Sequence, residues 1–388
     1  MSCLAAQFVK AGFAGENFPK HVFPSMVGRP VLRAEEALLG DDVKLKDVMV
    51  GQEAADMRRA LEVTYPVENG IINNWEDMEL IWDHVFYDRL GVDPKGKKLM
   101  LTEPPMNPER NKKRMLTTMF EKYEMGGVQV WWQALLTLYG QGLDTGVVVD
   151  SGDGVTHVVA VYDNTVIPTL TRRLNVAGRH ITRYVIKLLL LRGYSFNRSA
   201  DFQTVQELKE KLAYVAMEPE VERRLAAETT SLVEQYTLPD GREIKVGRER
   251  FEAPEALFSP HLIDVEGAGL SDMVFDMIQD ADMDLRPHFY KSIVLSGGST
   301  MYPGLPSRLE HDLKRRYLEE IAHGNQKTLR TMNITVKDPP LRKHLVFAGA
   351  SYISHIMRDR DSFWITKAEY EEHGVDRCVS KARMAGSA

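Results

Sequence analysis

The residues most able to do chemistry in this chain lie in one short segment, residues 147–159. Apolar β-branched runs flank a polar turn that contains two aspartates, two glycines, a serine and a threonine. Such runs around an Asp-Gly turn predict the two strands of a β-hairpin. Glycines let backbone N–H groups approach an anion closely, and a carboxylate such as Asp150 can hold a hydrated Mg²⁺. The segment therefore predicts a phosphate-binding hairpin, and we expect the chain to hold a nucleotide.

An ordinary hairpin explains part of the same pattern, because Asp-Gly between hydrophobic runs is also the strongest ligand-free hairpin signal. Asp150 at the strand end, with Thr156 and His157 directly after the turn, are residues that an ordinary hairpin does not need. They favour the phosphate-binding alternative. A single histidine near a strand is, however, more often structural than catalytic.

The composition limits the fold and the classes of function. At 388 residues the chain is too long for one typical hydrophobic core, so two domains or lobes are expected. The net charge of −6 argues against a nucleic-acid-binding protein, which usually has a concentrated basic face. Only Cys3 and Cys378 are present, which favours a reducing compartment and excludes a disulfide framework. The apolar run at residues 188–191 is far too short to cross a membrane.

Helical and strand patterns alternate along the chain and predict a mixed α/β fold with two lobes. Helices are expected at residues 74–90, 177–192, 202–217 and 305–317, and strands at residues 98–102, 129–132 and 292–296. Basic clusters at residues 112–114 and 314–316 lie in helical patterns, and they are expected to be solvated.

A second glycine-rich segment, residues 296–304, follows a predicted strand and leads into a helix. A Gly-Gly pair at the carboxyl end of a strand suits close approach of the backbone to a ligand. The segment lacks the Gly-Lys-Ser/Thr end of a Walker A loop, and by itself it favours a plain strand-to-helix turn. By pattern alone, Lys209 to Lys211 are solvated charges and Gln133 is a satisfied polar residue at a strand end.

Together these segments resemble one family, the actins and actin-related proteins, over almost the whole chain. The resemblance is carried by residues 8–15, 23–30, 150–157, 209–212 and 296–304. It implies an α/β, actin-like fold of two RNase H-like lobes, with four subdomains, around a nucleotide cleft. The first lobe would comprise residues 1–140 and 345–388, with a small subdomain at about 32–66 inserted. The second lobe would comprise residues 141–344, with a small subdomain at about 177–266 inserted.

The resemblance also implies ATP with Mg²⁺ or Ca²⁺ in the cleft. Asp150 would hold the metal through water, while Gln133 and His157 would position the attacking water. Residues 151–155 would cradle the β- and γ-phosphates, and Lys209 and Glu210 would meet the ribose and base. The full set of implied binding residues is Lys10, Ser151, Gly152, Asp153, Gly154, Val155, Gly178, Lys209, Glu210, Lys211, Gly298, Ser299, Thr300, Met301, Tyr302 and Lys343.

The sequence departs from the family pattern at its first phosphate hairpin. The family has Asp-Asn-Gly-Ser/Thr-Gly just before the position of Phe8, where this chain has Cys3-Leu4-Ala5-Ala6-Gln7. The aspartate, the glycines and the hydroxyl are replaced, and each lost charge-assisted contact typically costs about 1.5–3 kcal/mol. His180 also stands where the family usually has an aspartate, and the pair Trp131-Trp132 is bulkier than usual.

Four further segments indicate one branch of the family, a subunit of the complex that nucleates branched actin filaments. They are residues 101–108, 197–202, 236–242 and 249–258. Such a subunit would act mainly by assembly, as at most a slow ATPase and not as a metabolic enzyme. Its implied partners are actin-related protein 3, the other subunits of the complex, actin and nucleation-promoting factors. Direct nucleic-acid binding and membrane insertion are not expected.

The implied location is the cytoplasmic actin cytoskeleton, at actin patches or the cell cortex.

Three alternative functions stay open. One is a degenerate relative that keeps its protein contacts but has lost nucleotide binding. Another is a small-molecule kinase of the same fold, for which the sequence offers no motif with a catalytic carboxylate. A chaperone ATPase is the third, although no substrate-binding domain follows the predicted cleft.

Overall fold

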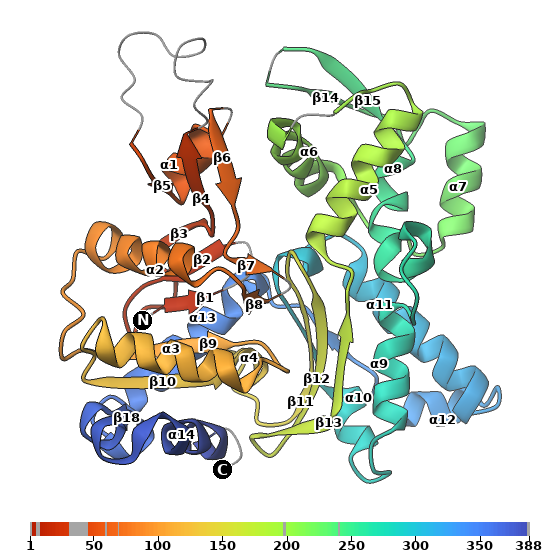
Figure 1. Cartoon of the computed structure of the whole chain (residues 1–388). Helices are drawn as coiled ribbons and strands as arrows, with labels where there is room; N and C mark the ends of the chain where they lie inside the picture. The colour runs from red at the N-terminus through yellow and green to blue at the C-terminus, as the bar shows by residue number, and fades with distance from the viewer. Residues whose placement is uncertain are drawn as a thin grey trace. The chain divides into compact units, whose positions relative to one another are not determined.

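The computed structural model describes residues 2–4, 8–30, 46–58, 60–68, 70–196, 199–239 and 241–385. The chain divides into two compact units, coloured along the sequence in Figure 1. The first unit comprises residues 1–144, 161–166 and 344–388, and the second comprises residues 145–160 and 167–343. Each unit has its own buried apolar core, as expected for a chain that is too long for one core. The boundaries of the lobes and of their inserted subdomains stay predictions.

The first unit contains a sheet in which β10 lies between β9 and β18, parallel to β9 and antiparallel to β18. Helix α4 packs against β10 and α13, and helix α14 packs against α3 and β18. The strands are β1 (Ser2–Leu4), β2 (Phe8–Ala11), β3 (His21–Pro24), β4 (Val27–Pro30), β5 (Met49–Val50), β6 (Leu61–Thr64), β7 (Val67–Glu68), β8 (Ile71–Ile72), β9 (Lys98–Glu103), β10 (Gly127–Trp132) and β18 (Ile365–Thr366). The helices are α1 (Gln52–Asp56), α2 (Trp75–Asp83), α3 (Glu109–Glu121), α4 (Gln133–Tyr139), α13 (Leu345–Ile356) and α14 (Lys367–Ala385).

The second unit is built on a five-stranded sheet with the order β13-β12-β11-β16-β17. Helix α10 packs against β11, and α11 packs against β17 and α9. The strands are β11 (Gly146–Ser151), β12 (Thr156–Tyr162), β13 (Thr165–Leu174), β14 (Glu234–Thr237), β15 (Glu243–Val246), β16 (Ile293–Ser296) and β17 (Val336–Lys337). The helices are α5 (Gly178–Leu191), α6 (Ser199–Leu212), α7 (Pro219–Glu228), α8 (Glu249–Glu252), α9 (Leu270–Gln279), α10 (Arg286–Lys291), α11 (Leu305–Arg316) and α12 (Gln326–Thr331).

Helix α2 forms where hydrophobic periodicity predicts a helix. The side chain of Asn74 caps it by accepting a hydrogen bond from the backbone N–H of Asp77 at 3.2 Å. Its buried apolar residues recur at spacings of three and four, at Met78, Ile81 and Trp82. A π-helical turn at residues 84–89 continues α2, so the predicted helix over residues 74–90 is confirmed.

Helix α6 ends five residues before its predicted end at residue 217. The backbone N–H of Val215 donates to the carbonyl oxygen of Pro303 at 2.8 Å, whereas a continued helix would use the carbonyl of Lys211. A tertiary hydrogen bond thus ends the helix. A pattern within the helix could not predict this contact.

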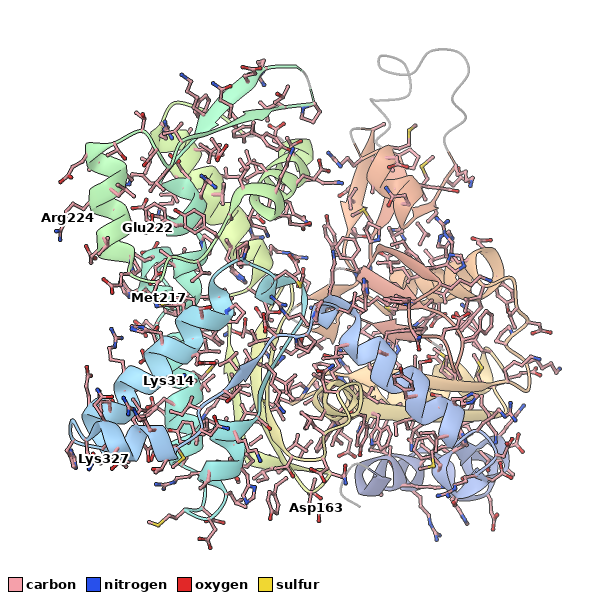
Figure 2. The ribbon with its side chains drawn as sticks, turned by 180° about the vertical axis from the view of Figure 1, so that it is seen from behind. Asp163, Met217, Glu222, Arg224, Lys314 and Lys327 are labelled. Carbon is pink, nitrogen blue, oxygen red and sulfur yellow. The ribbon has the colours of Figure 1, made fainter. Side chains whose placement is uncertain are left out.

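The expected solvation of the basic clusters is right in part. Lys314 on α11 lies at the periphery of the second unit (Figure 2) and pairs with Glu310 at 2.5 Å. The prediction is wrong for Lys112, which is buried with its Nζ 2.5 Å from the Oε1 of Glu103. Among the described residues, no helix has the length and apolar content to cross a membrane.

Candidate functional site

The predicted hairpin at residues 150–156 is confirmed by the turn between β11 and β12. The backbone N–H of Gly152 donates to the carbonyl of Val155 at 3.2 Å and closes the turn. The hydroxyl oxygens of Ser151 and Thr156 are 2.7 Å apart, and Thr156 donates onward to the carbonyl of Val176 at 2.7 Å. Gly152 is not among the described glycines with a positive φ. A Cβ added at Gly152 would meet only the carbonyl oxygen of Val155, at 3.9 Å, so the turn itself does not require glycine there.

The N-terminus of α5 donates hydrogen bonds to two backbone carbonyls of this turn. The backbone N–H of Gly178 donates to the carbonyl of Gly152 at 3.1 Å, and that of Arg179 donates to the carbonyl of Asp153 at 2.8 Å. The guanidinium Nε of Arg179 also donates to the Asp153 carboxylate at 2.9 Å. A Cβ added at Gly178 would lie 2.7 Å from the Oγ of Ser299, so the close packing requires glycine. The predicted site residues Gly152, Asp153 and Gly178 thus form one hydrogen-bonded unit.

His180 caps the same helix. Its Nδ1 accepts a hydrogen bond from the backbone N–H of Ala177 at 3.3 Å, a role that requires this nitrogen to be unprotonated. Burial, followed by the positive charge of Arg183, lowers the pKa of His180. An uncharged ring therefore does the capping that a carboxylate would otherwise do.

The end of β16 meets the end of β11, because the two strands are parallel with Asp150 opposite Ser296. Gly297 follows with φ of 91°, and a Cβ there would lie 2.2 Å from the carbonyl oxygen of Ser151. The Oγ of Ser299 donates to the carbonyl of Gly152 at 2.5 Å. This segment is thus more than the plain strand-to-helix turn that its sequence favours by itself, since it packs directly onto the hairpin.

Gly298 differs from Gly297 in its surroundings. A Cβ added at Gly298 would meet no atom within 4 Å, and its φ lies outside the left-handed region. The fold does not need glycine at position 298. Open space above this backbone is compatible with the predicted approach of a ligand.

Lys209 on α6 is buried, with 5% of its surface exposed. Its ammonium group donates to the carbonyl of Gly178 at 3.0 Å and to the hydroxyl of Thr182 at 2.9 Å. Burial lowers the pKa of Lys209, against the opposing effect of Asp153. The solvated-charge interpretation is therefore wrong for Lys209, whereas Glu210 and Lys211 are exposed as that interpretation predicts. The amine holds α6 to the start of α5.

His157 on β12 is 4% exposed, and burial, with the charge of Arg173 second, lowers its pKa to about 4. The ring is therefore neutral near physiological pH. A neutral imidazole can orient a water molecule by a hydrogen bond.

Two buried hydroxyls of the second unit, those of Ser296 and Tyr302, have no hydrogen-bond partner among the described residues. A buried polar group without a partner costs about 1–3 kcal/mol. Burial also raises the pKa of Tyr302. Orphaned groups beside a glycine-rich strand end fit a site that a ligand completes.

The other predicted site residues fall into two groups. In the second unit, the carbonyl of Thr300 accepts a hydrogen bond from the guanidinium of Arg342 at 3.1 Å. Lys343 directly follows Arg342 in the sequence. The side chain of Met301 is 40% exposed. Lys10 on β2 and Gln133 at the start of α4 belong to the first unit, and the structure does not relate them to the hairpin.

The altered first hairpin is only partly described. Cys3 pairs through its backbone with Lys10, and residues 5–7 lie outside the described residues.

Sequence reasoning missed Arg179, Thr182 and Arg342, which complete the network around the hairpin, and it missed the orphaned hydroxyl of Ser296. Arg179 directly follows the predicted Gly178, so its position could have suggested a carboxylate partner. The contacts of Thr182 and Arg342 join segments that are distant in sequence. No motif predicts such contacts.

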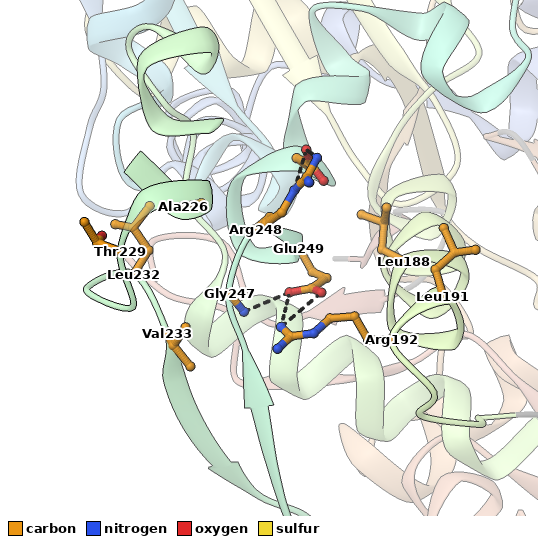
Figure 3. Close-up of a pocket in the computed structure, with 11 residues that line it drawn as sticks. Leu188, Leu191, Arg192, Ala226, Thr229, Leu232, Val233, Gly247, Arg248 and Glu249 are labelled. Atoms are coloured by element: carbon orange, nitrogen blue, oxygen red, sulfur yellow. Dashed lines mark hydrogen bonds and ion pairs between the residues drawn. The ribbon is translucent and has the colours of Figure 1, made fainter. Parts of the chain in front are cut away.

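A separate cavity of about 390 Å³ lies in the second unit, away from this network. Figure 3 shows apolar side chains of α5 and of the segment before β14 around an ion pair between Arg192 and Glu249. The cavity is lined by none of the predicted site residues.

The comparisons with known proteins identify the class of protein. Residues 5–383 match the family described as Actin. The chain therefore belongs to the actin family, and its mixed α/β fold is the one that this family predicts. This result confirms the resemblance carried by the glycine-rich segments and the Lys209 segment.

Within that family the chain is similar to proteins named actin-related protein 2. It is 59% identical to the one from Acanthamoeba castellanii, over 95% of this chain and 94% of the relative. It is 57% identical to that of Drosophila melanogaster, over 95% and 93% of the two chains. It is 56% identical to that of Caenorhabditis briggsae, over 96% and 95%. The resemblance of residues 101–108 and the three other segments to one branch of the family is thus confirmed as a similarity to actin-related protein 2.

Two substitutions distinguish the structural roles of Gly297 and Gly298, which directly follow β16. Gly297→Ala should lower the free energy of unfolding by about 3 kcal/mol or more, because it adds a backbone clash to a left-handed φ. Gly298→Ala should change the same quantity by less than about 0.5 kcal/mol. Urea unfolding followed by circular dichroism measures both. Equal effects of the two substitutions would contradict the packing of β16 onto the hairpin.

Acidification should destabilise the protein through His157 and His180. Their pKa values lie below the usual 6.5, so the unfolded chain binds more protons and stability rises with pH. The contribution of His157 is complete above about pH 6.5 and is lost as the pH falls towards about 4, and that of His180 falls in the same direction. For His157 the loss is of the order of 3 kcal/mol.

The urea midpoint at about pH 7.5 and about pH 4.5 checks this pH dependence. The His157→Gln variant should show a weaker dependence than the unsubstituted protein. An unchanged dependence would show that other groups control acid unfolding.

Proposed function

We propose that this protein is an ATP-binding subunit of the complex that nucleates branched actin filaments, and that it acts mainly by assembly. The observation that carries the proposal is the identity of 59% to an actin-related protein 2 over 95% of the chain. The protein would pair with actin-related protein 3 and the other subunits, and would meet actin and nucleation-promoting factors. Its place would be the cytoplasmic actin cytoskeleton.

The hydrogen-bonded unit around the hairpin supports the nucleotide part of the proposal. The turn at residues 151–155 would receive the phosphates along its glycine-containing backbone, and the first N–H groups of α5 hold that turn in place by donating to the carbonyls of Gly152 and Asp153. The open backbone at Gly298 and the orphaned hydroxyl of Tyr302 would face the adenosine part of the ligand. These residues fit a nucleotide, with Glu210 and Lys211 exposed beside them.

A divalent cation would accompany the nucleotide. Within the described chain, no group of three or more His, Cys, Asp or Glu side chains could hold a metal ion alone. Mg²⁺ usually keeps several waters and is shared between one or two carboxylates and substrate phosphates. Asp150 would therefore hold the cation through water, and the phosphates of ATP would supply its other ligands.

Slow hydrolysis is the only chemistry that we assign. The neutral ring of His157 would orient the attacking water, and the bound cation would supply charge stabilisation to the phosphates. A pKa of about 4 makes His157 a weak base, which suits orientation of water rather than its full deprotonation. We therefore propose ATP chiefly as a conformational ligand.

Assembly is the direct test of the proposed function. A tagged copy expressed in cells should co-purify with actin-related protein 3 and the remaining subunits at equal stoichiometry. The purified complex should produce branched filaments in a pyrene-actin assay viewed by fluorescence microscopy. Recovery of the protein as a monodisperse single chain, with no subunit attached, would refute the proposal.

Nucleotide binding is tested separately, by calorimetric titration of ATP with Mg²⁺. Gly298→Ala should weaken ATP binding about tenfold while leaving stability unchanged, because a Cβ enters space that the ligand needs. Restoring the family residues by Cys3→Asp, Ala5→Gly and Gln7→Gly should raise the affinity. Assembly without measurable ATP binding would instead identify the degenerate relative that keeps only its protein contacts.

A further inference from the structure

The hydroxyl of Ser296 occupies an unusual position at the carboxyl end of β16. The residue is 1% exposed, and its Oγ has no hydrogen-bond partner among the described residues. It stands opposite Asp150 in the parallel register of β11 and β16. Serine hydroxyls that are this buried are normally paired, so the orphan calls for an explanation.

Ser296 and Asp150 share one face of the sheet. Val149 and Leu295, the preceding residues of the same register, belong to the apolar core of the second unit. Because side chains alternate along a strand, the next pair projects to the opposite face. A Cβ added at Gly297 would lie 2.8 Å from the Oδ1 of Asp150, so the carboxylate reaches over the end of β16. The orphaned hydroxyl and the carboxylate therefore border the same space.

We propose that Ser296 is a positioning residue for the divalent cation that Asp150 holds through water. The oxygen of a metal-bound water faces the cation, so both of its hydrogens point outward and can be donated. Asp150 accepts one such hydrogen bond, and the Oγ of Ser296 accepts another from a water of the same shell. The bound cation thereby completes a buried hydroxyl that is otherwise unsatisfied. This inference rests on the proposed binding of ATP with a divalent cation.

The test compares Ser296→Ala with a matched control, Ser25→Ala. Ser25 is also fully buried with an orphaned Oγ, but it lies in the first unit. Calorimetry is performed with ATP in excess Mg²⁺ and again with ATP in excess EDTA. Ser296→Ala should weaken binding about tenfold in Mg²⁺ and less than about twofold in EDTA, as expected for a residue that acts through metal-bound water. Ser25→Ala should leave both affinities unchanged.

Two additional measurements exclude a merely structural role. The melting temperature of nucleotide-free Ser296→Ala should equal or exceed that of the unsubstituted protein, because an unsatisfied hydroxyl is removed. Ser296→Thr keeps the hydroxyl and should recover most of the Mg²⁺-dependent affinity.

Equal losses in Mg²⁺ and EDTA, or no loss in either, would overturn the role of Ser296. In that case ATP binding by the unsubstituted protein would still support the proposed function. If the unsubstituted protein bound no ATP in either buffer, the nucleotide part of the proposed function would fail, and the role of Ser296 would fail with it.

Discussion

The contact between the ends of β11 and β16 is the constraint on which the rest of the second unit depends. Two parallel strands end side by side, and Gly297 passes so close to Ser151 that a Cβ would lie 2.2 Å from its carbonyl oxygen. Only a residue without a side chain, in a left-handed backbone, permits this approach. The contact places the glycine-rich segment of β16 directly against the hairpin.

Three segments that are distant in sequence converge there. The hairpin accepts backbone hydrogen bonds from the start of α5, and the hydroxyl of Ser299 donates to the same turn. The ammonium group of Lys209 on α6 donates to the carbonyl of Gly178 and thereby holds the start of α5. A buried amine is expensive unless it is paired, and here a carbonyl and a hydroxyl receive it. The network is therefore a single polar core, and each segment depends on the others.

The sequence alone predicted the elements whose signals are local. The Asp-Gly turn and the spacing of Met78, Ile81 and Trp82 predicted the hairpin and α2 correctly. The prediction from sequence failed where a contact between segments distant in sequence decides the local structure. Lys209 matches a solvated charge by periodicity but is buried, and Val215 leaves the helix to bind Pro303. The family resemblance supplied the candidate site at Lys209 that periodicity could not, but not the orphaned hydroxyl of Ser296.

The hydrogen bonds that hold the hairpin turn affect the conformational entropy that the protein would lose on binding an anion. The hydrogen bonds of the turn that involve Thr156, Gly178 and Ser299 lie within the second unit. The protein's own residues thus hold the backbone of the turn in place. A phosphate that bound there would immobilise few additional torsions, so little conformational entropy would oppose its capture. The protein has met that entropic cost during folding, through contacts among its own residues.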